Sequence, residues 1–349
     1  MRGVIDIPDH LAGVQELIGE GLVGVERAFD AQLDSDLPPV DDLCEHIERY
    51  RGKMLRPMLV LLCGAAARDG LAELLEARSF DAVATPAHAR AGAVCEMVHM
   101  ATLVHDDVLD EADVRRRGQT VNALRGNELA VILGDYLIAS AYELCSRFDS
   151  PVPARVIGRA SSVMCTGELL QLHSRENASL DERTYFEILE RKTGALIGAA
   201  CELGVLCTLG FGSLEDERTL ACRTYGRRLG VAFQIQDDLL DLTGDEAVVG
   251  KSVRKDIEKG KLTYPLIHHL ANADAPLRGR TLRMVEQPGR QDADGDIAAA
   301  LAVTGSIEAS HAVARRLVDD AKKALGAIPE GPGRDMLHLM ADAVVDRSH

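Results

Sequence analysis

Hydrophobic residues recur at helical spacing along almost the whole chain. Apolar side chains repeat every three or four residues, which is the period of an amphipathic α-helix. The stretches with this period are Leu11–Phe29, Leu55–Ala67, Ala91–Leu109, Leu129–Cys145, Arg155–Leu172, Tyr185–Leu206, Leu220–Leu242, His311–Leu325 and Met336–Val345. Because alternating β-branched stretches of comparable length are missing from the sequence, the pattern predicts an all-α protein.

Clusters of turn-forming residues separate the predicted helices. They lie at Leu37-Pro38-Pro39, Pro151-Val152-Pro153, Gly210–Ser213, Gly244–Gly260 and Gln287–Asp296. None has the composition of a flexible linker, and no helix pair repeats at a fixed period, so we expect residues 1–349 to form a single large helical domain. The chain has 31 glycines, more than helices usually contain, and some should lie at helix ends and close helix crossings.

Composition and charge exclude several classes of function. Apolar residues make up 46% and charged residues 27% of the chain, which is typical of a globular protein. Aromatic residues make up only 3%, without tryptophan, so a base-stacking surface for nucleic acid is not expected. The 39 basic and 55 acidic residues give a net charge of −16, which repels phosphate backbones and anionic lipid. We therefore expect no nucleic-acid partner.

Cysteine spacing and the N-terminal sequence favour a cytoplasmic location. The eight cysteines form no Cys-x-x-Cys pair and have no histidines at zinc-site spacing, so we expect small buried side chains in a reducing compartment. No basic segment followed by an apolar stretch opens the chain. The longest apolar run, Met58–Ala67, is about half the length of a membrane span. The sequence therefore predicts no transmembrane segment.

Two acidic clusters of identical form carry the strongest chemical signal. Asp106-Asp107-x-x-Asp110 and Asp237-Asp238-x-x-Asp241 each follow an apolar helical segment. The first and last aspartates of each cluster lie on one helix face, one turn apart. Like charges at that spacing repel each other, so a single cluster would be read as a solvated helix end. Two identical clusters emerging from apolar helices instead predict facing walls of one cavity that hold a hard cation.

The chemistry of these clusters favours magnesium. Carboxylate oxygens without a nearby His or Cys ligand suit Mg²⁺ better than zinc or copper, and the sequence lacks an EF-hand calcium loop. Magnesium usually shares its remaining ligands with substrate phosphates. Basic residues stand close to both clusters and at a predicted helix start: Lys53, Arg56, Arg115, Arg116, Arg117, Lys251, Lys255, Lys259 and Lys261. Together they predict a diphosphate-binding site.

The ordered set of motifs resembles the trans-isoprenyl diphosphate synthases of the polyprenyl synthetase family. The resemblance extends from about residue 45 to Arg347, and one Asp-Asp-x-x-Asp alone would be weak evidence. Its landmarks are Gly52-Lys53-x-x-Arg56-Pro57, His99, Asp106–Asp110, Arg115-Arg116, Gly167-Glu168-x-x-Gln171, Lys192-Thr193, Phe233-Gln234, Asp237–Asp241, Gly250-Lys251, Asp256 and Gly260-Lys261-x-Thr263-x-Pro265. Met54 and Arg117-Gly118 depart from the usual pattern without removing a named contact.

The resemblance implies the isoprenoid synthase fold, a helical bundle around a central cavity, and a specific reaction. Isopentenyl diphosphate would be joined head-to-tail to an allylic diphosphate, with about three Mg²⁺ ions bridging the allylic diphosphate. It implies Asp106, Asp110 and Asp237 as metal ligands, supported by Asp107, Asp238 and Asp241. Arg115 and Lys192 would act with them in catalysis. Homodimerisation is likewise expected from the family.

The resemblance also divides the substrate contacts into two groups. The allylic side would comprise Arg115, Lys192, Thr193, Gln234, Lys251 and Lys261, and the isopentenyl side Lys53, Arg56, His99 and Arg116. His99 agrees with the helical period, because it precedes Asp106 by seven residues, two turns along one face. A lone histidine on an apolar helix would otherwise be expected in the core.

Product length is implied by the residues before the first aspartate cluster. In the family, a bulky aromatic residue about one turn before this cluster stops chain growth early. Here that position is Ala101, and Val98 and Val94 continue its stripe along the helix. The stripe lacks an aromatic residue, which favours a long product of C35–C50. A short-chain synthase making C15 or C20 remains the alternative, because other helices can close the tunnel.

Three other readings fit less well. A class I terpene cyclase has a different second metal motif and needs an aromatic-lined pocket, whereas this chain has only six Phe and six Tyr. A non-catalytic partner subunit would have lost aspartates or phosphate-binding basic residues, and none is missing. A generic acidic metal-binding protein would not account for the ordered Lys, Arg, Thr and Gln.

Overall fold

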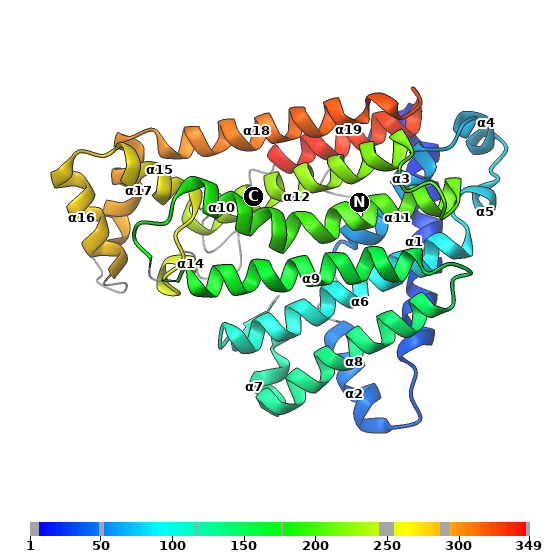
Figure 1. Ribbon diagram of the computed structural model, residues 1–349, viewed down its shortest axis with the longest axis horizontal. Helices are drawn as coiled ribbons and strands as arrows, with labels where there is room; N and C mark the ends of the chain where they lie inside the picture. The colour runs from blue at the N-terminus through cyan, green and yellow to red at the C-terminus, as the bar shows by residue number, and fades with distance from the viewer. Residues whose placement is uncertain are drawn as a thin grey trace. The chain divides into compact units, whose positions relative to one another are not determined.

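The computed structural model describes residues 7–48, 52–115, 118–175, 177–243, 255–286 and 293–346. These residues are helical almost throughout, which confirms the all-α prediction. The helices are η1 (Asp9–Leu11), α1 (Ala12–Leu33), α2 (Pro38–Glu48), α3 (Leu55–Ala66), α4 (Leu71–Glu76), α5 (Phe80–Val83), α6 (Pro86–Leu109), α7 (Val121–Arg125), α8 (Asn127–Ser146), α9 (Val152–His173), α10 (Glu182–Leu189), η2 (Glu190–Gly194), α11 (Ala195–Leu209), α12 (Glu217–Thr243), α14 (Lys255–Glu258), α15 (Tyr264–Asn272), α16 (Ala275–Glu286), α17 (Ala293–Val303), α18 (Ser306–Ala324), η3 (Leu325–Ala327) and α19 (Pro332–Val345) (Figure 1). Strands β1 (Val114–Arg115) and β2 (Gly118–Gln119) pair in antiparallel fashion.

The apolar period locates the long helices well and the short ones poorly. The stretch from Ala91 to Leu109 becomes α6, and the stretch from Leu220 to Leu242 becomes most of α12. The predicted break at Pro38 is instead the first residue of α2, because proline is well tolerated in the first turn of a helix. The short helices α4, α5 and α7 carry too few turns for a period to be recognised.

The chain groups into two compact units. The first comprises Met1–Ser161, Leu196–Gly226 and Ala324–Met340, and the second comprises Ser162–Ala195, Arg227–Lys323 and Ala341–His349. Helices α9 and α12 each contribute residues to both units. The single domain expected from the sequence stays a prediction.

The first unit is built around α6. This helix packs along α8 and also contacts α1 and α3 (Figure 1). Most of its middle residues are buried, including Val94, Met97, Val98 and Ala101. The helix begins at a capping box, in which the Thr85 side chain accepts from the His88 backbone N–H and the His88 side chain accepts from the Thr85 backbone N–H. Such caps satisfy backbone donors that have no partner within the first helical turn.

Close helix crossings explain two glycines of the first unit. A side chain on Gly204 of α11 would overlap the backbone carbonyl of Val60 on α3, and a side chain on Gly64 would overlap the His88 ring. Only glycine allows the backbones to approach this closely. The expectation that glycines mark tight crossings is therefore confirmed at these positions.

His88 joins three helices of the first unit through its imidazole. Its Nδ1 lies 2.8 Å from Thr85 Oγ1 and its Nε2 lies 3.0 Å from Thr208 Oγ1. Thr208 Oγ1 in turn donates to the carbonyl of Gly64 at 2.8 Å. Burial is the main cause that lowers the pKa of His88 from 6.5 to about 4, so the fold holds the imidazole neutral.

The neutral His88 predicts a loss of stability in acid. The unfolded chain binds this proton near pH 6.5 and the folded chain only near pH 4. The contribution is therefore complete above pH 6.5, and about 3 kcal/mol is lost as the pH falls towards 4. We expect the difference in melting temperature between the wild type and His88→Gln to be large at pH 7 and to shrink steadily towards pH 4.5. A difference that does not change with pH would contradict this assignment.

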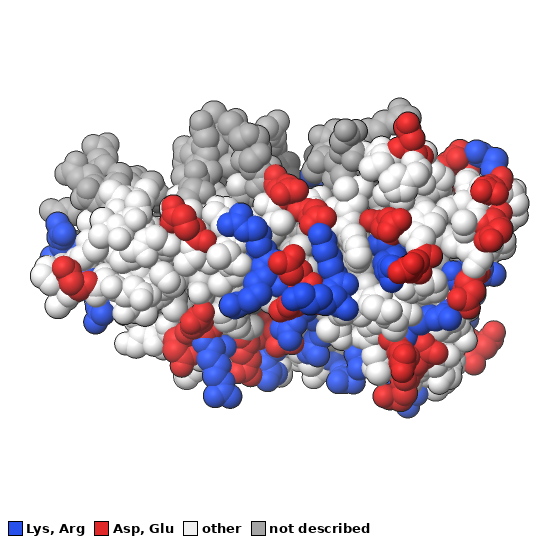
Figure 2. Space-filling view, turned by 90° about the horizontal axis from the view of Figure 1, so that it is seen from above, with Lys and Arg blue, Asp and Glu red and all other residues white. Residues whose placement is uncertain are grey.

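Two helical segments among the described residues are long and apolar enough to cross a membrane, judged by length and composition alone. They are Asn127–Ser146 and Glu182–Leu209, with 44% and 67% of their most apolar windows buried inside the protein. On the face drawn in Figure 2, basic side chains stand among acidic ones.

Candidate active site

The first aspartate cluster lies where α6 ends in the first unit. The helix stops at Leu109, and Asp110 is the residue that caps it. Asp106 and Asp110 are half-buried, whereas the side chain of Asp107 is only 2% exposed. The cluster therefore contains two accessible carboxylates, one turn apart, on either side of a buried one.

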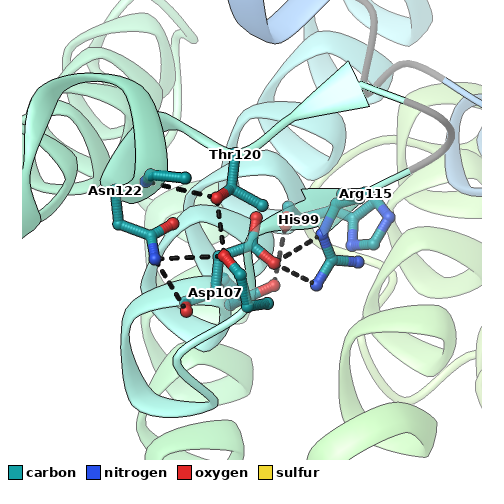
Figure 3. A network of polar contacts seen from close by, with 8 residues as sticks. His99, Asp107, Arg115, Thr120 and Asn122 are labelled. Atoms are coloured by element: carbon teal, nitrogen blue, oxygen red, sulfur yellow. Dashed lines mark hydrogen bonds and ion pairs between the residues drawn. The ribbon is translucent and has the colours of Figure 1, made fainter.

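Asp107 is held by Arg115. The guanidinium donates from Nε and Nη2 to Asp107 Oδ1, both at 2.8 Å (Figure 3). Two donors on one carboxylate oxygen make a strong, charge-assisted contact in a buried setting. Asp107 thus fixes the position of Arg115, a residue expected on the allylic side.

A short β-hairpin places Arg115 next to Asp107. Strands β1 and β2 pair Val114 with Gln119 and Arg115 with Gly118. After β2, Thr120 donates to the carbonyl of Ala112 at 2.6 Å, and Asn122 donates to the same carbonyl and to that of Asp107 (Figure 3). Arg116, expected on the isopentenyl side, lies outside the described residues.

The other residues expected on the isopentenyl side lie on, or just before, two helices of the first unit. Lys53 is exposed just before α3, Arg56 is half-buried in its first turn, and His99 is half-buried on α6. Between the two basic residues, Met54 is buried and adopts a left-handed backbone with φ 52°. A non-glycine residue in this conformation stores strain, which is common at functional sites. Met54 is also one of the two departures from the family pattern.

The second unit contains a cavity of about 120 Å³ that gathers most of the predicted allylic-side residues. Its lining comes from α9, α10 with η2, α12, α14 and the segment before α15. The lining residues are Gln171, Ser174, Arg175, Leu180, Tyr185, Ile188, Leu189, Lys192, Thr193, Gln234, Asp238, Asp256, Lys261, Leu262 and Thr263. Lys192, Thr193, Gln234 and Lys261 were each predicted from the sequence, and this unit brings them together.

A chain of hydrogen bonds orders the polar side chains of this cavity. Tyr185 donates to Asp238 Oδ2 at 2.6 Å, and Gln234 Nε2 donates to Asp238 Oδ1 at 3.0 Å. Thr193 in turn donates to Gln234 Oε1 at 3.1 Å. Burial and the nearby Asp256 raise the pKa of Asp238 well above the ordinary range of an aspartate, and the bonds from Gln234 and Tyr185 act in the opposite direction.

Lys192 and Thr193 lie in a local irregularity of their helix. Residues Glu190–Gly194 form a π-helical turn between α10 and α11, and such turns are frequent at functional sites. Lys192 forms an ion pair with Glu168 of α9. A side chain on Gly167 would crowd Arg191 and the backbone of Lys192. The Gly167-Glu168 motif therefore acts in two ways: the glycine admits α9 to the π turn, and the glutamate holds the lysine.

The segment after α12 returns to the same cavity. The backbone N–H of Asp256 donates to Asp241 Oδ2 at 3.2 Å, and the backbone N–H of Lys261 donates to the carbonyl of Asp256 at 2.8 Å. These bonds connect the second aspartate cluster to the lysine that lines the cavity. Lys251 lies outside the described residues.

The accessible aspartates suit a magnesium site completed by substrate. Among the residues that the structure describes, no three Asp, Glu, His or Cys side chains form a metal site by themselves. Asp106 with Asp110, and Asp237 with Asp241, are instead half-buried pairs one turn apart in their own units. Mg²⁺ typically takes one or two carboxylates and completes its shell with water and phosphate oxygens. The donor set of each pair fits that ion.

Comparisons with known proteins agree with this chemistry. Residues 38–303 match the model of a family described as polyprenyl synthetase. The chain is 33% identical to octaprenyl diphosphate synthase of Escherichia coli over 343 residues, 97% of this chain and 99% of the relative. The chain belongs to the polyprenyl synthetase family.

Solved structures show that this polyprenyl synthetase also resembles known proteins in its fold. A decaprenyl diphosphate synthase from Rhodobacter capsulatus superposes with a TM-score of 0.83 at 35% identity, covering 97% of this chain and 99% of that one. A polyprenyl synthase from Caulobacter crescentus, complexed with calcium and isoprenyl diphosphate, gives 0.84 at 29% identity with 100% of both chains covered. The isoprenoid synthase fold is thereby confirmed, and the chain is a prenyl transferase similar to long-chain synthases.

The product-length stripe of the polyprenyl synthetase lies inside the first unit. Ala101, Val98 and Val94 are exposed by 0%, 2% and 1% on α6. They lie on α6, on the N-terminal side of the first aspartate cluster, as the sequence predicts. Their role in product length stays a prediction.

Tyr185 and Glu168 are site residues whose contacts the sequence did not predict. Tyr185 precedes Lys192 by seven residues, but the π turn at Glu190–Gly194 interrupts the regular helical period between them. Its hydrogen-bond acceptor, Asp238, lies on another helix 53 residues away in sequence, and no local pattern predicts such a contact.

The Asp107–Arg115 pair predicts a stability effect in the first unit. Asp107→Asn removes the charge that holds a partly buried guanidinium, and we expect it to lower the free energy of unfolding by roughly 1–3 kcal/mol. Denaturant unfolding of the purified variant measures this loss.

A matched control is available on the surface of the same unit. Arg147 bonds both oxygens of Glu143 on α8, with side chains 53% and 51% exposed. Glu143→Gln should cost less than about 1 kcal/mol, because solvent screens the pair. Equal losses in the two variants would show that burial adds nothing to the Asp107 contact.

Proposed function

We propose that this polyprenyl synthetase condenses isopentenyl diphosphate head-to-tail with an allylic diphosphate to make an all-trans product of C35–C50. The observation that carries the proposal is the cavity of the second unit, which gathers Lys192, Thr193, Gln234 and Lys261 from three separate segments. Two cations and several hydrogen-bond donors in an acidic protein are what a diphosphate requires.

Ionisation of the allylic substrate is the first step of the proposed mechanism. The C–O bond breaks, and its electron pair leaves with the diphosphate, whose growing charge Lys192, Lys261 and Arg115 would stabilise. When bound, about three Mg²⁺ ions would neutralise the same charge. Asp106, Asp110 and Asp237 are suited to hold them, with Asp107, Asp238 and Asp241 in support.

The second substrate, isopentenyl diphosphate, supplies the double bond that forms the new carbon–carbon bond. Lys53, Arg56, His99 and Arg116 would hold the diphosphate of isopentenyl diphosphate, where arginine offers bidentate contacts. The isopentenyl double bond attacks the allylic cation, and a proton is then lost to the released diphosphate. The scheme requires no nucleophilic side chain, in agreement with a sequence in which we identify no catalytic triad.

A product assay tests the proposed reaction. Purified protein would receive Mg²⁺, labelled isopentenyl diphosphate and, separately, C5, C10, C15 or C20 allylic primers, with EDTA and Asp106→Ala as controls. We expect a metal-dependent ladder ending at C35 or longer. Absence of elongation with every primer, in protein shown to be folded, would overturn the proposal.

The same assay separates product length from chemistry. Ala101→Phe places a bulky ring on the buried stripe, and we expect the ladder to stop near C15 or C20 while the first condensation persists. Overpacking costs about 1–3 kcal/mol, so melting temperatures accompany the assay. A wild-type ladder that already stops at C15 or C20 would keep the reaction and refute the long product.

The homodimer expected from the family finds support on α8. Its outer face exposes Leu129, Val131, Ile132 and Tyr142 by 40% or more, while its inner face packs on α6. Glu128, Asp135 and Glu143 lie on the same side of the helix, among these residues. Exposed apolar side chains gathered on one helix are typical of a contact surface between proteins, and we assign a second copy of the chain to this one.

Light scattering tests this interface. The chain has a mass of 37.6 kDa, so we expect a wild-type species of twice that mass and a largely monomeric Ile132→Glu variant. Val303→Glu is the control, because Val303 is 73% exposed on α17 in the other unit and should leave the dimer intact. A monomeric wild type, or a dimeric Ile132→Glu, would refute the assignment.

We also infer a cytoplasmic location. The two long apolar segments bury 44% and 67% of their most apolar windows inside the protein, as helices that pack in a globular core do. The free cysteines, most of them buried, suit a reducing compartment. Both diphosphate substrates are water-soluble at the start of the reaction.

A further inference from the structure

The phenol of Tyr185 connects two helices that line the cavity of the second unit. The residue is 4% exposed and lies on α10, one helical turn from the π turn that carries Lys192 and Thr193. Its hydroxyl donates to Asp238 on α12 at 2.6 Å. This hydroxyl therefore joins α10 to α12 through a buried hydrogen bond.

Asp238 links the Tyr185 hydroxyl to residues that are predicted to contact the diphosphate. The other oxygen of Asp238 accepts from Gln234 at 3.0 Å, and the Gln234 carbonyl oxygen accepts from Thr193 at 3.1 Å. With both amide groups engaged, the orientation of Gln234 is fixed. Tyr185 is therefore the starting point of a chain that ends at two residues expected on the allylic side.

The aromatic surroundings alone do not require this hydroxyl. The Tyr185 ring packs at 5.4 Å from Phe186 and 6.0 Å from Tyr264, measured between ring centroids. Phenylalanine would keep both ring contacts. The hydroxyl differs in that it donates to a buried carboxyl group, which is costly to leave without a partner.

We propose that Tyr185 is a positioning residue for the allylic diphosphate, acting through Asp238 on Gln234 and Thr193. This inference rests on the proposed function of the cavity. Without the hydroxyl, the Asp238 carboxylate loses one of its two side-chain donors and is free to turn, and the Gln234 amide turns with it. The diphosphate contacts would then be disordered before substrate arrives. Isopentenyl diphosphate, whose expected contacts all lie in the first unit, should be affected little.

Tyr185→Phe and its neighbour Tyr264→Phe form a matched pair for the test. Both remove one hydroxyl from the same aromatic cluster, but Tyr264 is not among the cavity-lining residues. In steady-state kinetics, we expect Tyr185→Phe to raise the KM for the allylic diphosphate about tenfold and to leave the KM for isopentenyl diphosphate within about twofold. Tyr264→Phe should change neither.

A binding measurement keeps the inference separate from the reaction. Calorimetry with inorganic diphosphate and Mg²⁺ should show about tenfold weaker binding to Tyr185→Phe than to the wild type or Tyr264→Phe. If the wild type elongates no primer but Tyr185→Phe still weakens diphosphate binding, the proposed reaction is wrong and the positioning role stands. If the wild type elongates and Tyr185→Phe has an unchanged KM and diphosphate affinity, with only a lower melting temperature, the hydroxyl is structural and the inference is overturned.

Discussion

Asp107 and Asp238 carry buried carboxyl groups, and the polar side chains around each are placed to hydrogen-bond with it. A polar group taken out of water is stable only with partners held in place. Asp107 receives two nitrogens of Arg115, and Asp238 receives Gln234 and Tyr185. In both clusters the buried aspartate thus orients side chains that are expected to bind substrate, and the other two aspartates stay accessible. One sequence motif thereby supplies both the expected metal ligands and the groups that hold their surroundings in place.

Rigid placement of the basic side chains follows from the same principle. Lys192 is paired with Glu168 and Arg115 with Asp107, so neither cation has to be ordered at the moment of binding. An acidic chain can bind diphosphate in this way, because local pairing decides where positive charge is presented. Donors that are already oriented stabilise developing charge without reorganisation, which is the physical basis of electrostatic catalysis.

The sequence predicts what depends on helical period and misses what depends on packing. The two aspartate clusters appear at helix ends because apolar spacing and the four-residue separation of Asp106 and Asp110 are local properties. The allylic-side set Lys192, Thr193, Gln234 and Lys261 follows from motif order. The acceptor of Tyr185 and the hairpin that aims Arg115 depend on contacts between segments far apart in the chain. The left-handed Met54 depends on the path of the backbone, which residue type does not reveal.

The π turn at Glu190–Gly194 places one extra residue within an otherwise continuous helix. Every side chain after it is rotated by about 100° relative to an uninterrupted α-helix. The face of α10 that presents Tyr185 is therefore not continued by α11, and the two halves of the helix can meet different neighbours. In evolutionary terms, the segment is a place where losing a single residue would restore regular geometry and turn one half of the helix away from its partners. Relatives that lack this residue should be recognisable by a gap here in an alignment, and by altered residues opposite α11.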